Sequence, residues 1–268
     1  MKTILLHSNS SKAFTGFGKN AKNILRYLYK TRKYKIIEFA NGTTWNHPEL
    51  KNRPWETQGS LPNNQAILEQ IQHNPEAQRD AGYGAMTVDQ AISEYKPDIY
   101  IGVEDIWGFN NYWKRKWWNK TNCMIWTTLD SLPILPTAVE AAPDVKNFYV
   151  WASFAEKEMR KIGHGHVKTL PGAVDTSTFF RLSDENRKQL RARHNLSDEF
   201  IIGFVFRNQL RKSVPNILDG FQIFKKQNPQ NTEVKVDKKQ NSVHNGKEDG
   251  KDSENITITD QNKMPSIN

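Results

Sequence analysis

Apolar and polar residues along the chain fall into short blocks whose periodicity predicts strands and helices in alternation. Thr3–Leu6 and Tyr34–Ala40 are apolar runs of the kind that form buried strands. Between them, one face of a predicted helix carries apolar residues at the i, i+3, i+4, i+7 spacing, namely Ala21, Ile24, Leu25 and Leu28. A strand, a loop containing Gly16–Gly18, a helix and a second strand in this order predict the opening of a doubly wound, Rossmann-like α/β domain with a parallel sheet.

The alternation continues through the first domain. Helices are predicted over 88–95 and 155–162, and strands over 98–103, 123–128 and 148–152. Asn41–Pro62 has no periodicity and is predicted to be a long, ordered loop. Its two tryptophans, Trp45 and Trp55, would either anchor the loop on the core or form a platform for an acceptor molecule.

A further strand–turn–helix unit spans Phe200–Phe221. Its first seven residues, FIIGFVF, favour a strand that is buried on both faces of a parallel sheet. Arg207 and Lys212 occupy the turn, and Ser213 is positioned to cap the helix that follows. The turn would hold an anion between two cations and free backbone amides, or it is an ordinary βα turn with two solvated cations.

Charge is distributed unevenly over the 268 residues, whose formal net charge is +9. Residues 1–227 hold 32 of the 38 Lys and Arg and 22 of the 29 Asp and Glu, which gives this part a net charge of +10. Residues 228–268 have a net charge of −1 and contain no Phe, Trp or Tyr. The basic part suggests an anionic partner, and the polar tail is expected to be disordered.

Cysteine content and hydropathy limit the class of protein. The single cysteine, Cys123, excludes an intramolecular disulfide and a zinc site made of thiolates. No apolar run approaches the length of about eighteen residues that a membrane span needs, and the N-terminal apolar run is too short for a signal peptide. The expectation is a cytoplasmic protein, either free or peripheral to a membrane.

Candidate chemistry gathers where predicted strands end, and in open α/β sheets ligands bind beyond the carboxyl ends of the strands. The candidates there are Gly16, Phe17, Gly18, Glu104, Asp105, Asp130, Arg207 and Lys212. Each is a weak signal alone, because a G-x-G pair serves either a close phosphate contact or a tight turn. Their shared position predicts one site at this edge. His164 and His166 have no third ligand nearby, so no metal site is predicted.

Trp107–Lys120 interleaves aromatic and basic residues. On a helix, Trp113 and Trp117 would face one way and form a buried anchor with solvated cations around it. The alternative is a surface on which bases of single-stranded nucleic acid stack, and it is the less favoured of the two.

Three segments together resemble the GT-B glycosyltransferases of the family 4 type. TGFGKNAKNILRYL matches the family's opening loop and helix, and a strand-edge aspartate follows it along the chain. Leu170–Phe179 resembles the family's P-N-G-V-D-x-x-x-F segment between two Rossmann-like domains, with Gly172 and Ala173 where Asn and Gly are usual. Arg207 and Lys212 are similar to its R-x-x-x-K pair, with one extra residue of spacing. The resemblance covers residues 1 to about 227.

The resemblance implies transfer of a sugar from a nucleotide-sugar donor to an unidentified acceptor (glycan, lipid or protein), with no metal and no further cofactor. It implies an acceptor domain over 1–178, and a linker helix with the start of a donor domain over 179–227. The implied site residues are Gly16, Phe17, Gly18, Arg207 and Lys212 for the donor diphosphate, Asp130 for catalysis, and Glu104 and Asp105 on the acceptor side.

Two departures from the family qualify this hypothesis. Leu129 stands where the family often has a histidine, so acceptor activation by that histidine is not expected. One βα unit followed by the polar tail 228–268 predicts a C-terminally truncated donor domain, which a second chain would complete. The alternatives are a non-catalytic GT-B module that binds an acceptor or partner and, less favoured, a basic nucleic-acid-binding protein.

Overall fold

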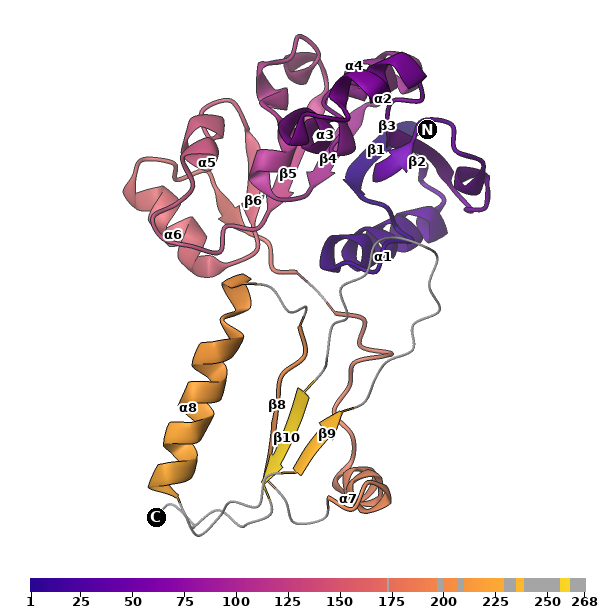
Figure 1. Cartoon of the computed structure of the whole chain (residues 1–268). Coiled ribbons are helices and arrows are strands. Elements are labelled where there is room, and N and C mark those ends of the chain that lie inside the picture. The colour runs from indigo at the N-terminus through magenta and orange to yellow at the C-terminus, as the bar shows by residue number, and fades with distance from the viewer. Residues whose placement is uncertain (173, 197–199, 207–209, 229–234, 239–255, 261–268) are drawn as a thin grey trace. The chain divides into compact units, whose positions relative to one another are not determined.

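The computed structural model of the chain describes residues 1–172, 174–196, 200–206, 210–228, 235–238 and 256–260 (Figure 1). Within these residues the chain divides into two compact units, Met1–Phe179 and Phe180–Asn268. Arg207, one of the predicted phosphate ligands, lies outside the described residues, as does Ala173.

The first unit is built on a seven-stranded sheet in the order β3-β2-β1-β4-β5-β6-β7, and each neighbouring pair is parallel. The strands are β1 (Lys2–Asn9), β2 (Tyr34–Thr44), β3 (Glu56–Leu61), β4 (Ile99–Val103), β5 (Asn122–Thr127), β6 (Asn147–Val150) and β7 (Lys168–Thr169). The strand order reverses between β1 and β4, which is where ligands of such sheets bind. The predicted doubly wound, Rossmann-like α/β fold is confirmed.

Helices cover both faces of this sheet, because successive side chains of each strand point to opposite faces. On one face, α1 (Gly16–Thr31) packs its Ala21 and Leu25 on Ile4 and Leu6 of β1. On the other face, Leu5 joins a larger core that includes residues of α4 (Val88–Tyr95), α5 (Pro136–Ala141) and α6 (Ser153–Lys161). Figure 1 shows α1 on the opposite side of β1 and β2 from α3 (Pro75–Gly82) and α4. The remaining helix of this region, α2, spans Gln65–Ile71.

The prediction of a long loop over Asn41–Pro62 is wrong, because β2 runs on to Thr44 and β3 pairs with it. A 3-10 turn, η1 (Pro48–Lys51), lies between them. The β3 sequence ETQGSL has almost no apolar residues, and its polar side chains are used in tertiary hydrogen bonds: the Ser60 hydroxyl, for example, donates to the Gly82 carbonyl at 2.7 Å. Trp45 and Trp55 are buried, which confirms that they anchor this segment on the core.

The prediction of a helix within Trp107–Lys120 is also wrong. The segment forms three 3-10 turns, η2 (Ile106–Phe109), η3 (Tyr112–Lys114) and η4 (Trp118–Lys120), because Asn110 and Asn111 take left-handed backbone conformations with φ of 41° and 55°. The indoles are nevertheless structural: Trp113 and Trp118 are buried, and the Trp117 Nε1 donates to Asp89 at 2.7 Å. They offer no row of exposed faces for base stacking.

The second unit contains α7 (Asp184–Arg193), β8 (Phe200–Gly203), η5 (Leu210–Lys212), α8 (Val214–Gln227), β9 (Lys235–Lys238) and β10 (Ile256–Asp260). The βα unit of β8 and α8 is present, but β8 pairs antiparallel with β10, which pairs with β9. The expectation of a strand buried in a parallel sheet is therefore wrong for β8, and Ile201 is exposed. Two strands lie in the polar segment 228–268, where no periodicity indicated them.

Ser213 does not cap α8 as predicted. Its φ is 51°, its side chain makes no capping hydrogen bond, and its amide donates to the Leu210 carbonyl at 3.0 Å. The backbone is thus committed to closing η5 and cannot adopt the extended conformation of a capping serine. Across the part of the chain that the structure describes, no helix combines the length and apolar character needed to cross a membrane.

Candidate functional site

The loop between β1 and α1 presents backbone amides at the carboxyl edge of the sheet. Thr15 caps α1, since its Oγ1 accepts from the Gly18 amide at 3.0 Å and from the Asn9 side-chain amide at 2.9 Å. The amides of Gly16 and Phe17 have no acceptor among the described residues. Two free N–H groups at the positive end of a 16-residue helix form a suitable position for an anion.

The two glycines of this loop differ in role. A Cβ on Gly18 would lie 2.6 Å from the Ala13 carbonyl oxygen and 2.7 Å from that of Ser10, so only glycine lets the loop fold back on the helix. A Cβ on Gly16 would meet nothing within 4 Å. Gly18 therefore makes the tight turn that was one of the two predicted roles of the G-x-G pair, and Gly16 leaves open space beside a free amide.

A buried ion pair holds the same loop from the α1 face of the sheet. Glu38 of β2 accepts hydrogen bonds from the Ser11 amide and from the Trp55 Nε1, each at 2.7 Å. The Arg53 Nε lies 3.3 Å from the Glu38 Oε2, and the Arg53 Nη2 donates to the Ser10 hydroxyl at 2.9 Å. Sequence reasoning missed this pair, although a glutamate inside the apolar run of β2 was a visible signal.

A hydrogen-bonded network crosses the other face at the ends of β1, β2 and β4. The His7 Nδ1 lies 2.7 Å from the Tyr100 hydroxyl, and its Nε2 lies 2.6 Å from the Asn41 Oδ1. The Asn41 Nδ2 then donates to the Glu104 Oε2 at 3.3 Å. Because the Asn41 Oδ1 can only accept, the His7 Nε2 carries the proton and the Nδ1 accepts from Tyr100. Burial lowers the pKa of His7 to about 4, so the ring is neutral.

Glu104 and Asp105 lie at the end of β4, where the sequence predicted them. Glu104 is 2% exposed, and burial raises the pKa of its carboxyl group to about 7. Asp105 accepts a hydrogen bond from the Thr128 hydroxyl, which joins the ends of β4 and β5. A carboxyl group that titrates near neutral pH is suited to proton transfer in either direction.

A pocket of about 460 Å³ opens beside this network. Its lining comes from three segments: Asn9, Ser10 and Ala13; Asn41, Gly42 and Thr43; and Arg79, Gly82 and Tyr83. Burial, and next to it the negative charge of Glu104, raise the pKa of Tyr83 to about 12. The pocket thus combines amides, a phenol that stays protonated and one cation, which suits a ligand with several hydroxyl groups.

Asp130 and Lys212 are the remaining predicted site residues that the structure describes. Asp130 is exposed beyond the end of β5, and it makes no hydrogen bond or ion pair with other described residues. Lys212 ends η5 in the second unit. The structure brings together Gly16, Phe17, Gly18, Glu104 and Asp105 on one edge of the first unit. Within the described ranges no group of three or more His, Cys, Asp and Glu is placed to hold a metal ion.

Comparison with known proteins gives a likeness of fold. No protein-family model and no curated protein sequence matches the chain. Sucrose-phosphate synthase from Thermosynechococcus elongatus aligns with 82% of this chain at 16% identity and a TM-score of 0.53, and the chain spans 59% of its length. A second structure of that name covers 73% of this chain and 97% of its own at 12% identity; its TM-score of 0.39 supports no argument. The first likeness shows a GT-B glycosyltransferase-like fold.

Proposed function

We propose that the chain is a glycosyltransferase of the GT-B type that transfers a sugar from a nucleotide-sugar donor to an acceptor hydroxyl without a metal ion or cofactor. The observation that carries this proposal is that the free α1 amides and the Glu104 network both lie at the carboxyl edge of the sheet, where the strand order reverses between β1 and β4. The fold of the solved neighbour supports the class of reaction.

On the acceptor side, the hydroxyl would bind in the pocket beside Asn41 and Tyr83. Glu104, with its pKa raised to about 7, would take up the proton that the hydroxyl loses, and Asp105 would stay anchored to Thr128. Asp130 would orient the acceptor, since its carboxylate is exposed and engaged by no described residue.

On the donor side, departure of the sugar leaves negative charge on a diphosphate. The amides of Gly16 and Phe17 would stabilise that charge, while Gly18 acts through the shape of the loop because its own amide already bonds Thr15. For Arg207 and Lys212 the proposal rests on the sequence resemblance alone, which implies that Arg207 forks onto two phosphate oxygens of the donor and that Lys212 acts as a point charge.

Isothermal titration of the whole chain with UDP, GDP and ADP tests the proposal. One of them should bind saturably, and Arg207→Ala or Lys212→Ala should each weaken binding about tenfold or more, as expected for a charge-assisted contact. Lys225→Ala, which removes an exposed cation of α8, is the control with the same change in charge. Failure of all three nucleotides to bind at millimolar concentration would refute the proposal and favour a non-catalytic GT-B module.

A further inference from the structure

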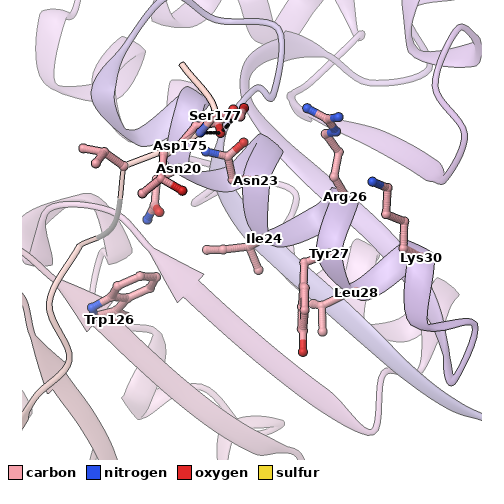
Figure 2. A pocket seen from close by; sticks show the side chains of 12 residues that line it. Asn20, Asn23, Ile24, Arg26, Tyr27, Leu28, Lys30, Trp126, Asp175 and Ser177 are labelled. Atoms are coloured by element: carbon pink, nitrogen blue, oxygen red, sulfur yellow. Dashed lines mark hydrogen bonds between the residues drawn. The ribbon is translucent and has the colours of Figure 1, made fainter. Parts of the chain in front are cut away.

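A second pocket, of about 610 Å³, lies along α1 on the face of the sheet opposite the His7 network. Figure 2 shows Asn20, Ile24 and Tyr27 of α1 along it, Trp126 of β5 at one end, and Asp175 near Asn20. The α1 residues recur at helical spacing and form one side of the pocket. Its volume falls in the range of ligand sites, and none of these residues takes part in the proposed transfer.

Two buried donors near this pocket have no hydrogen-bond partner among the described residues. The Asn20 side chain is 8% exposed, it lines the pocket, and its Nδ2 is unpaired. The Trp151 Nε1 is likewise unpaired, and its ring lies 5.4 Å from that of Trp126 and 5.6 Å from that of Phe17. Buried donors are nearly always satisfied, so the unpaired Asn20 donor on the wall of the pocket indicates that an oxygen atom of a ligand completes it.

The rest of the lining defines the class of that ligand. Asn23 and Asp175 supply acceptor oxygens, whereas Ile24, Leu28 and the Trp126 indole supply apolar surface. Hydroxyl groups both donate and accept, so they match this mixture, and the C–H faces of a sugar ring would pack on the indole and on Ile24. An anion would find its cations, Arg26 and Lys30, away from Asn20 (Figure 2) and would face the carboxylate of Asp175.

We infer that this pocket binds a saccharide at a site separate from the proposed transfer site. The inference does not depend on catalysis, because it concerns equilibrium binding to the α1 face alone. It extends the proposed function by adding a second carbohydrate-binding position to the first unit.

Saturation-transfer NMR on the whole chain tests the inference with glucose, galactose, mannose, N-acetylglucosamine, maltose and cellobiose as probes. At least one of them should receive saturation and bind at millimolar concentration. Asn20→Leu should weaken that binding about tenfold, since it removes a donor that only the ligand satisfies. Its melting temperature should not fall, because the Asn20 amide nitrogen has no protein partner to lose.

Two further variants make the result decisive. Tyr27→Ala removes an aromatic side chain that lines the pocket and is 71% exposed, so it should weaken binding without affecting folding. Lys22→Ala, exposed on the same helix but not lining the pocket, should bind as the wild type does. The inference is overturned if no probe receives saturation, if Asn20→Leu and Tyr27→Ala both bind normally, or if inorganic phosphate binds in an Asn20-dependent manner while the sugars do not.

Discussion

The buried pair of Glu38 and Arg53 should determine both the stability of the first unit and the shape of the loop before α1. The two side chains are 2% and 5% exposed and lie 3.3 Å apart. Glu38→Gln preserves the shape of the side chain but removes its charge, and it replaces one acceptor oxygen with an amide donor. Arg53 would then be a buried charge without a counterion, and its Nη1 already has no partner among the described residues.

The expected loss can be worked from this geometry. Removing one partner of a buried ion pair costs about 3–5 kcal/mol. For a unit of this size, each kcal/mol lowers the melting temperature by about 2–4 °C, so Glu38→Gln should lower it by roughly 6–20 °C. Differential scanning calorimetry of the whole chain gives this value. The double variant Glu38→Gln/Arg53→Met should recover roughly half of the loss, because no uncompensated charge stays buried.

An exposed ion pair in the same sheet provides the control. Lys35 and Glu56 lie 3.0 Å apart with side chains 50% and 44% exposed, so Glu56→Gln should change the free energy of unfolding by less than about 1 kcal/mol. A Glu38→Gln protein that melts within about 2 °C of the wild type would refute the reasoning. If the double variant lost as much as the two single variants together, the hydrogen bonds to Ser11 and Trp55, and not the charge pair, would hold the loop.

Two further predictions concern the site itself. Gly18→Ala should lower the free energy of unfolding by about 1–3 kcal/mol, because the new Cβ would meet two carbonyl oxygens. Gly16→Ala should leave the free energy of unfolding unchanged or raise it by up to about 1 kcal/mol. Equal effects of the two variants in urea denaturation would contradict this prediction. Because burial raises the pKa of Glu104 from 4.5 to about 7, the folded state binds more protons between these pH values, and its contribution to stability falls as the pH rises through that window. Glu104→Gln should remove this loss of stability at rising pH. If urea denaturation gave the wild type and the variant the same dependence of stability on pH, the prediction would be wrong. The lowered pKa of His7, about 4, acts in the opposite sense, since stability is lost as the pH falls from 6.5 toward 4.

The parts of the fold that follow from local periodicity could be predicted closely. The helix expected over 88–95 has those bounds, and the strand expected over 98–103 is β4. α1 begins at Gly16, five residues before the predicted apolar stripe starts at Ala21, because the Thr15 cap begins the helix there. β3 could not be found, since its polar side chains are satisfied by residues far along the chain, such as Thr57 by Glu38.

The candidate site, like the fold, could be predicted from the sequence only in part. Glu104 and Asp105 could be predicted because carboxyl ends of parallel strands meet at one edge. Their partners could not, because His7 and Asn41 are 34 positions apart in the chain, and Asn41 and Glu104 are 63 apart. The sequence assigned the acidic edge to the acceptor, but only tertiary burial shows that Glu104 is the carboxyl group poised to titrate near neutral pH.

α1 connects the two proposed sites, and its geometry explains why they can be separated experimentally. Its first turn offers the amides of Gly16 and Phe17 at the sheet edge, while its side, from Asn20 onward, lines the saccharide pocket. Backbone amides are insensitive to a side-chain change one turn away, so Asn20→Leu should leave nucleotide binding intact. Nucleotide binding also depends on Lys212, which does not line the saccharide pocket, so Lys212→Ala should leave saccharide binding intact. Each ligand class therefore reports on one site, and loss of both from a single Asn20 substitution would mean that α1 couples them.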